Sequence, residues 1–408
     1  MISEKKRWTM LVANVIINIC VGVGYAWSVF QTPLIDIFGW STAEASLAFT
    51  LIMGVSAIPM PFVGKLQEYI KPRAIILAGG LLYGICVFLT GYAKSLTALY
   101  LSFGILAGLG QGTVYSTGIS NMIKLFPDKR GLCSGLLAAG MGSGAVIIAP
   151  VAANLINKFG VQDTFKILGV CFTIIICALS ALIATAPENF KPEGWNPENK
   201  KTNSLDIADK NWRQMLKDPR FYLIAGMFTA GTISGMMIIG HASPLFQETI
   251  KVSPQTAAIL VGFLSMCNTS GRILWGLISD KIGRFNTILI LYIIIGISMF
   301  GLAINLGSTA FIIFMMVVGL CYGGFMSLIA SLTADSFGPK NLAINFGIMF
   351  NAYGLASFIG PRLGAVIQQA NNGSFAQAFY FSVFICIAGM ILTIGAMVKS
   401  KTGSVKAV

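Results

Sequence analysis

Arg272 is the residue of this sequence whose side chain is best suited to bind a charged ligand. It lies eight residues before Asp280, in an apolar segment long enough to cross a membrane. At about 1.5 Å per residue, this spacing places it about 12 Å inside a helix, where a charge costs roughly 2.5 to 3.5 kcal/mol. Its guanidinium stays protonated and matches a carboxylate with two parallel donors. Because no Asp or Glu lies inside any apolar segment, a carboxylate ligand is favoured over a structural salt bridge.

His241 is the single histidine of the chain and lies in the string Gly240-His241-Ala242-Ser243-Pro244. Imidazole changes its charge near neutral pH, so His241 is a candidate for proton coupling. The alternative is a hydrogen-bonded histidine between helices. A second arginine, Arg362, follows Pro361 and either reaches the outer membrane surface or attracts anions into a cavity.

Polar and aromatic side chains recur at helical spacings in the same apolar segments. We predict that they contact the substrate, although Tyr and Trp are also common in packing seams and membrane interfaces. These candidates are Tyr25, Trp27, Gln111, Tyr115, Asn268, Tyr322, Asn351 and Tyr353.

The sequence gives no sign of catalytic or metal chemistry. Its eight cysteines are scattered singly through apolar segments without Cys-x-x-Cys spacing, and a chain with one histidine is a poor source of zinc ligands. There is no Ser/His/Asp set. We therefore expect no catalytic residue, no metal and no cofactor, and we consider a membrane-embedded enzyme or receptor the less favoured class.

The elements that carry these residues are apolar and long. Hydrophobic residues make up 55% of the chain and charged residues 11%, against roughly a quarter charged in soluble domains. The alternation of an outer-membrane barrel is absent, so these segments are expected to be helices. We predict an all-α integral membrane protein with twelve transmembrane helices, beginning near residues 8, 43, 74, 97, 132, 164, 220, 255, 286, 309, 341 and 376.

The net charge of +13 is distributed unevenly between the two faces that these helices define. Nearly all Lys and Arg residues fall in the termini, the central linker and the loops after even-numbered helices. The opposite face holds only Lys94, Lys158, Lys166 and Lys251. This is the positive-inside bias, which predicts that both termini are cytoplasmic and gives no reason to expect a nucleic-acid partner.

A polar stretch divides the chain into two similar halves. We predict an N-terminal six-helix bundle over residues 1–186, a cytoplasmic linker over 187–219 and a C-terminal six-helix bundle over 220–408. The string beginning at Gly64 recurs at Gly276, an offset of 212 residues (276 − 64), and the loop beginning at Phe126 recurs at Phe337, an offset of 211 (337 − 126). Two landmarks in nearly the same register indicate a duplicated six-helix unit.

The second copy, Gly276-Leu277-Ile278-Ser279-Asp280-Lys281-Ile282-Gly283-Arg284, resembles the loop signature of the major facilitator superfamily. The first copy keeps an acid as Glu68 but lacks the Gly-Arg pair. The strings Tyr25-Ala26-Trp27-Ser28 and Gly271-Arg272, the latter followed by Trp275-Gly276, resemble the oxalate/formate antiporter and monocarboxylate transporter branch. This resemblance implies two bundles that open alternately to each side, with a binding site near the bilayer midplane at their interface.

The resemblance also implies roles for charged loop residues and for the choice of substrate. Asp280, Arg284, Asp128 and Arg130 are expected to act in gating. Tyr353 stands where oxalate carriers of this branch have a second cation, which favours a monoanion. Asn268 stands where animal monocarboxylate carriers have an Asp, so their proton route does not carry over directly.

Together these inferences predict a secondary active transporter of a small monocarboxylate anion such as lactate, pyruvate or formate. The placement of His241 before Pro244 resembles the branch pattern and favours coupling to protons. The alternative is an oxalate:formate type of anion exchange. We expect a monomer in the inner cell membrane, with a small carboxylate, protons and lipid as its partners.

Overall fold

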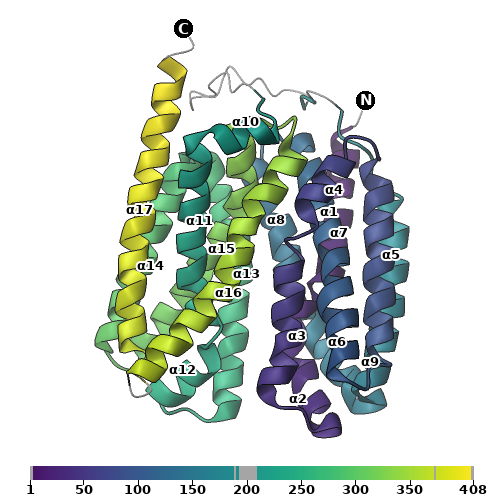
Figure 1. Cartoon of the computed structure of the whole chain (residues 1–408), viewed down its shortest axis with the longest axis vertical. Coiled ribbons are helices and arrows are strands. Elements are labelled where there is room, and N and C mark those ends of the chain that lie inside the picture. Colours follow the sequence, from purple (N-terminus) through teal and green to yellow (C-terminus); the bar gives the residue numbers. More distant parts are fainter. Residues whose placement is uncertain (1–2, 188–189, 193–208, 372–373, 406–408) are drawn as a thin grey trace. The chain divides into compact units, whose positions relative to one another are not determined.

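The computed structural model describes residues 3–187, 190–192, 209–371 and 374–405, and every regular element in those ranges is a helix (Figure 1). The elements before the linker are α1 (Glu4–Val21), η1 (Gly22–Ala26), α2 (Trp27–Phe38), α3 (Thr42–Val55), α4 (Met60–Leu66), α5 (Pro72–Thr90), α6 (Leu96–Leu99), η2 (Tyr100–Leu106), α7 (Ala107–Leu125), α8 (Arg130–Gly142), η3 (Gly144–Ile148) and α9 (Ala149–Ser180). Those from the linker onward are α10 (Trp212–Lys217), α11 (Pro219–Ile239), α12 (Ala242–Thr249), α13 (Pro254–Ile282), α14 (Arg284–Ile304), α15 (Ser308–Phe337), α16 (Leu342–Ala370) and α17 (Ala376–Val405).

Eleven helical stretches of the described residues are long and apolar enough to cross a membrane. One of them, Arg130–Ser180, has 51 residues and would be about 75 Å long as a single helix, more than twice the roughly 30 Å of a hydrocarbon core. It is broken at Gly160, where φ is +79° and the backbone leaves the helical conformation. The stretch therefore supplies two crossings. The predicted all-α fold with twelve membrane helices is confirmed.

The chain forms two compact units. The first unit comprises Met1–Asp128, Leu136–Trp195 and Leu342–Gly354, and the second comprises Lys129–Gly135, Asn196–Asn341 and Leu355–Val408. The start of α8 thus belongs to the second unit and the first half of α16 to the first. Most of the predicted linker, at residues 188–189 and 193–208, lies outside the described residues. The predicted boundaries at 186 and 219 stay a prediction.

The duplicated glycines of the sequence have equivalent packing roles. A Cβ atom on Gly64 would lie 2.5 Å from the carbonyl oxygen of Ala343, at the start of α16 in the first unit. A Cβ atom on Gly276 would lie 2.3 Å from the carbonyl oxygen of Gly131, at the start of α8 in the second unit. In each unit a glycine therefore lets two helix backbones approach where a side chain would not fit.

The cores of the two units share a second feature, which the sequence motifs did not indicate. Tyr83 on α5 is fully buried and donates its hydroxyl to the carbonyl oxygen of Cys20 on α1. Tyr292 on α14 is also fully buried and donates to the carbonyl oxygen of Met227 on α11. Because a phenol in an apolar interior needs a partner, each tyrosine fixes one helix against its neighbour.

The end of the linker is held to the second unit by polar contacts near α10, which lies beside the start of α11 (Figure 1). The backbone N–H of Lys210 donates to the carbonyl oxygen of Phe337 over 2.9 Å. Asp218 caps the first turn of α11 and accepts from the side chains of Arg220 and Lys210. Burial alone would raise the pKa of Asp218, but hydrogen bonds from Arg220 and Lys210 outweigh it and lower this pKa to about 2.

Candidate functional site

Arg272 lies in the interior of α13, in the second unit, and is only 3% exposed. Its Nε donates to the Oδ1 atom of Asn268, one helical turn earlier, over 3.0 Å. Asn268 is itself buried. In the sequence, no Asp or Glu occurs between Glu248 and Asp280. The structure therefore brings together two of the predicted site residues and places a permanent positive charge in an apolar helix.

Three glycines bring other backbones close to α13 at Arg272. A Cβ atom on Gly135 of α8 would lie 2.4 Å from the carbonyl oxygen of Arg272, and one on Gly323 of α15 would lie 3.0 Å from its backbone nitrogen. On α13 itself, a Cβ atom on Gly271 would lie 1.9 Å from the carbonyl oxygen of Leu320. The backbone that carries the arginine is thus fixed on two sides by close helix packing.

The first unit contains an aromatic cluster that includes two predicted site residues. Tyr115 on α7 is buried and packs against Phe346 and Phe350 of α16, with ring centroids 6.3 and 5.8 Å apart. Phe350 in turn packs against Tyr353 at 4.8 Å. Neither phenylalanine was among the predicted residues, although both precede Tyr353 at helical spacings that the sequence shows.

Gln111, one turn before Tyr115 on α7, is fully buried, and neither polar atom of its amide has a hydrogen-bond partner within the described part of the chain. A buried amide without partners is costly, typically by 1 to 3 kcal/mol. Such a group is uncommon in a folded protein and marks Gln111 as a candidate for contact with a polar solute or water.

The other predicted residues of the first unit lie in packed or partly open surroundings. Trp27 begins α2 and packs against Phe103 with a centroid distance of 4.8 Å, so its ring belongs to the core of the unit. Tyr25 is half-buried in η1. Asn351 is also half-buried and donates to the carbonyl oxygen of Gly347 on the same helix. In the second unit, Tyr322 of α15 is buried and packs on Gly235 of α11.

His241 lies between α11 and α12 in the second unit. Its Nε2 atom is 2.8 Å from the carbonyl oxygen of Pro361, inside α16, and its ring lies 5.4 Å from that of Phe375. A carbonyl oxygen only accepts hydrogen bonds, so Nε2 carries a hydrogen and Nδ1 is the nitrogen available to a further proton. The next residue after Pro361, Arg362, is exposed.

The loop signature forms a network of charges in the second unit. Asp280 accepts the backbone N–H groups of Gly131 and Leu132, at the start of α8, over 2.9 Å each. Arg284 pairs with Asp280 at 2.7 Å and with Asp335 at 2.9 Å, and Arg130 pairs with the other oxygen of Asp335. Two arginines and two aspartates thus connect the starts of α8 and α14 to the ends of α13 and α15.

Asp128, which the sequence grouped with Arg130, has a different partner in the structure. It forms a bidentate pair with Arg7 of α1 in the first unit, at 2.9 and 3.3 Å, and Arg7 is only 3% exposed. The sequence analysis missed Arg7 and Asp335 as functional candidates. The sequence does set Asp335 apart, since it is the only acidic residue after Asp280. Glu68, the acid of the first copy, pairs instead with the exposed Lys65.

Within the described ranges, no cluster of three His, Cys, Asp or Glu side chains could hold a metal ion. The candidate site residues instead carry a guanidinium, amides, phenols, an indole and one imidazole. Such groups bind and orient a polar solute. The fold and these residues together define the class: a multi-pass membrane transport protein built from two related helical units.

The sequence model described as Major Facilitator Superfamily matches residues 11–310, and the chain belongs to that family. The "Oxalate:formate antiporter" of Oxalobacter formigenes is 30% identical over 376 residues, which cover 91% of this chain and 87% of that protein. "Monocarboxylate transporter 12" of Homo sapiens is 25% identical over 413 residues, covering 94% and 79%. The crystal structure of the human organic anion transporter MFSD10 superposes with a TM-score of 0.74 at 11% identity, over 95% of this chain and 99% of that one, and thus shares the fold.

Proposed function

We propose that this protein is a secondary active transporter of a small monocarboxylate anion, such as lactate, pyruvate or formate, which works by alternating access. Arg272 binds the carboxylate, and Asn268 orients its guanidinium through the Nε contact. We assign the other candidate residues to shaping the site for the apolar part of the solute. The protein acts as a transporter without catalytic chemistry of its own.

The burial of Arg272 is the observation that carries this proposal. A guanidinium that is 3% exposed in an apolar helix has lost its water shell, and its fork of donors matches the two oxygens of a carboxylate. The names of two relatives that span nearly the whole chain, the "Oxalate:formate antiporter" and "Monocarboxylate transporter 12", agree with a carboxylate substrate. Arg272 together with Tyr353, which stands where a second cation would help bind a dianion, favours a monoanion.

Uptake into liposomes by Arg272 variants tests the proposal. Purified protein is reconstituted, and the uptake of labelled lactate, pyruvate, formate and oxalate is followed with and without a pH gradient. We expect Arg272→Gln to lower the affinity for the transported anion by about 100-fold, because a desolvated charge pair is worth roughly 2 to 5 kcal/mol. Arg272→Lys keeps the charge but loses the fork, so its affinity should be intermediate.

Arg362→Gln is the matched control, since it removes an exposed arginine from the same unit. It should leave the affinity within about twofold of the wild type. Equal losses in Arg272→Gln and Arg362→Gln would show that general positive charge, and not the buried arginine, governs uptake. Unchanged uptake in Arg272→Gln would remove the residue on which the proposal depends.

The second candidate function is the exchange of oxalate for formate. It is favoured by the 30% identity to the antiporter of Oxalobacter formigenes across 91% of this chain. Exchange predicts that labelled oxalate enters only liposomes preloaded with formate or oxalate, regardless of the pH gradient. Monoanion uptake into unloaded liposomes, driven by a pH gradient, would instead support proton-coupled transport.

We further propose that both termini face the cytoplasm, that the protein works as a monomer in the inner cell membrane, and that His241 carries the coupling proton. The basic residues of the termini, the linker and the loops after even-numbered helices support the first point. The hydrogen bond to Pro361, which leaves Nδ1 available, supports the third.

A further inference from the structure

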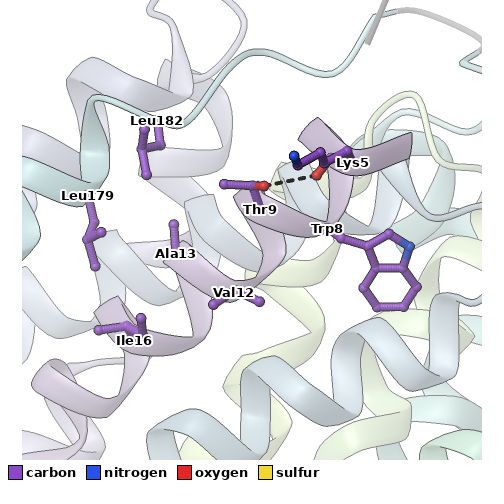
Figure 2. A pocket seen from close by; sticks show the side chains of 8 residues that line it. All are labelled: Lys5, Trp8, Thr9, Val12, Ala13, Ile16, Leu179 and Leu182. Carbon is purple, nitrogen blue, oxygen red and sulfur yellow. Dashed lines mark hydrogen bonds between the residues drawn. The ribbon is translucent and has the colours of Figure 1, made fainter. Parts of the chain in front are cut away.

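A groove on the first unit, remote in sequence from Arg272, has an apolar floor. It runs between α1 and the end of α9 and has a volume of about 390 Å³. Figure 2 shows Leu179 and Leu182 on one side of it, facing Ala13 and Ile16 of α1 on the other. Ile16 and Leu182 are 38% and 46% exposed. The groove therefore presents apolar surface along the length of a membrane helix.

The groove continues into a basic pocket at the end where α1 begins. This pocket has a volume of about 600 Å³ and is lined by Lys5, Lys6 and Arg73, together with uncharged residues. All three basic side chains are exposed. Lys5, Thr9 and Leu182 line both parts, so the basic pocket and the apolar groove adjoin.

The charge of this pocket is not balanced by acids in the described part of the chain. No Asp or Glu is among its lining residues, and none of the ion pairs formed by the described residues involves Lys5, Lys6 or Arg73. By contrast, Arg7 of the same helix turn is paired with Asp128. The three basic side chains therefore remain available to an external anion.

Trp8 lines the apolar groove beside the residues that the groove shares with the basic pocket, and it indicates the depth of this end of the groove in a membrane. It is half-buried beside Lys5 and Thr9, and its ring packs edge-on against Phe126 with centroids 5.1 Å apart. Tryptophan is enriched at the level of lipid headgroups. Three basic residues next to a tryptophan, above an apolar groove, match the order of phosphate, interface and acyl chain in a phospholipid.

We propose that this groove binds an anionic phospholipid, whose phosphate lies on Lys5, Lys6 and Arg73 and whose acyl chain lies along Ile16, Leu179 and Leu182. Basic pockets between membrane helices bind anionic headgroups by this combination of charge and apolar contact. The charge complementarity distinguishes this occupant from a zwitterionic lipid or an apolar segment of protein. The site is separate from the transport substrate and does not depend on its identity.

Native mass spectrometry of the purified full-length protein, titrated in detergent with phosphatidylglycerol or phosphatidylcholine, tests this site. We expect the wild type to retain phosphatidylglycerol in preference to phosphatidylcholine. The triple variant Lys5→Ala, Lys6→Ala, Arg73→Ala should bind phosphatidylglycerol roughly 100-fold more weakly, since each basic residue near an anionic surface contributes about fivefold. Thr9→Trp, which blocks the junction of the two parts, should weaken binding while the three charges remain.

The matched control is the triple variant Arg213→Ala, Lys217→Ala, Lys281→Ala. It also removes one arginine and two lysines, but from exposed positions in the second unit. It should bind phosphatidylglycerol as the wild type does. Circular dichroism and thermal unfolding of each variant confirm that it is folded. Equal retention of both lipids by the wild type, or equal losses in the two triple variants, would overturn the proposal. Absence of lipid from the wild type would also overturn it and assign the groove to another occupant, such as the chain's own linker.

Discussion

At the scale of single residues, the protein combines a permanent charge buried in the interior of a membrane helix, Arg272, with several buried neutral polar groups. Arg272 cannot release its proton, so burial does not neutralise it and its charge must be balanced by other groups. Gln111 of the first unit is also buried, and its amide has no hydrogen-bond partner among the described residues. Both residues were predicted from their types and spacing. Their near-complete burial became evident only in the structure.

His241 allows a residue-scale prediction that separates proton transfer from structure. His241→Gln keeps a side-chain N–H that can reach the carbonyl oxygen of Pro361, whereas His241→Ala removes it. Neither variant can carry a proton on an imidazole. We expect both to lose the stimulation of uptake by a pH gradient in liposomes, while only His241→Ala loses stability, by about 1 kcal/mol in thermal unfolding.

If a pH gradient stimulated uptake by His241→Gln as strongly as uptake by the wild type, His241 would have a role in helix packing alone. Counterflow without a pH gradient is the internal control. It should persist in His241→Gln, because exchange of one anion for another requires no net proton movement.

At the scale of elements, α13 is the helix on which the site depends. Its length of 29 residues exceeds the roughly 20 needed to span a membrane, and it carries Asn268 and Arg272 one turn apart, followed by Asp280. Close contacts at Gly271 and from Gly323 fix its position against α15. An arginine can be held in one geometry only if the helix that carries it is itself held.

Two glycines of α13 provide a matched test of this packing. A Cβ atom on Gly271 would lie 1.9 Å from the carbonyl oxygen of Leu320, whereas one on Gly262 would have no atom within 4 Å. We expect Gly271→Ala to destabilise the protein by about 1 to 3 kcal/mol, as overpacking does. Gly262→Ala should be neutral or stabilising by up to about 1 kcal/mol, because alanine favours helix.

Thermal unfolding in detergent measures the stability of both variants, and liposome uptake measures their function. Gly271→Ala should also weaken the affinity for the anion, because a shift of the backbone at residue 271 moves Arg272, the next residue. Similar unfolding temperatures for the two alanine variants would contradict the close contact between α13 and α15.

At the scale of the whole molecule, duplication explains both what is repeated and what is not. Gly64 and Gly276 have the same packing role, and Tyr83 and Tyr292 make the same kind of hydrogen bond. The charged network of the second unit is not repeated in this form, since Glu68 of the first unit pairs with Lys65, three residues earlier on the same stretch of chain. The two units therefore share a scaffold but differ in their charged connections.

Asp335 offers a prediction about this network. Asp335→Asn removes the carboxylate that Arg130 and Arg284 share, which leaves two neighbouring arginines without it. We expect a loss of about 1 to 3 kcal/mol in stability, and a fall in the initial uptake rate with anion affinity within about twofold of the wild type. Uptake and anion binding are measured on the same preparations.

Asp163→Asn is the control, because its partner Lys166 is only three residues away and Asp163 is 57% exposed. It should change neither rate nor stability by more than about 0.5 kcal/mol. An equal effect of the two substitutions, or a loss of anion affinity in Asp335→Asn, would contradict a gating role for the network.

The membrane class, the helical elements, the duplication and the candidate arginine could all be predicted from the sequence. These properties depend on composition, on the length of apolar runs and on local spacing, all of which are read along the chain. The expected segment starts near residues 220, 309 and 376 correspond to α11, α15 and α17, which begin at 219, 308 and 376.

Which side chains meet could not be predicted from the sequence and became known from the packing of the helices. The pairing of Asp128 with Arg7, of Arg130 with Asp335 and of Tyr115 with Phe350 joins residues far apart in the chain. Contacts of this kind depend on how helices rotate and approach, and close approach depends in turn on glycines such as Gly323. The hydrophobic pattern places a residue in a helix, whereas its partner is chosen by the packing of that helix against the others.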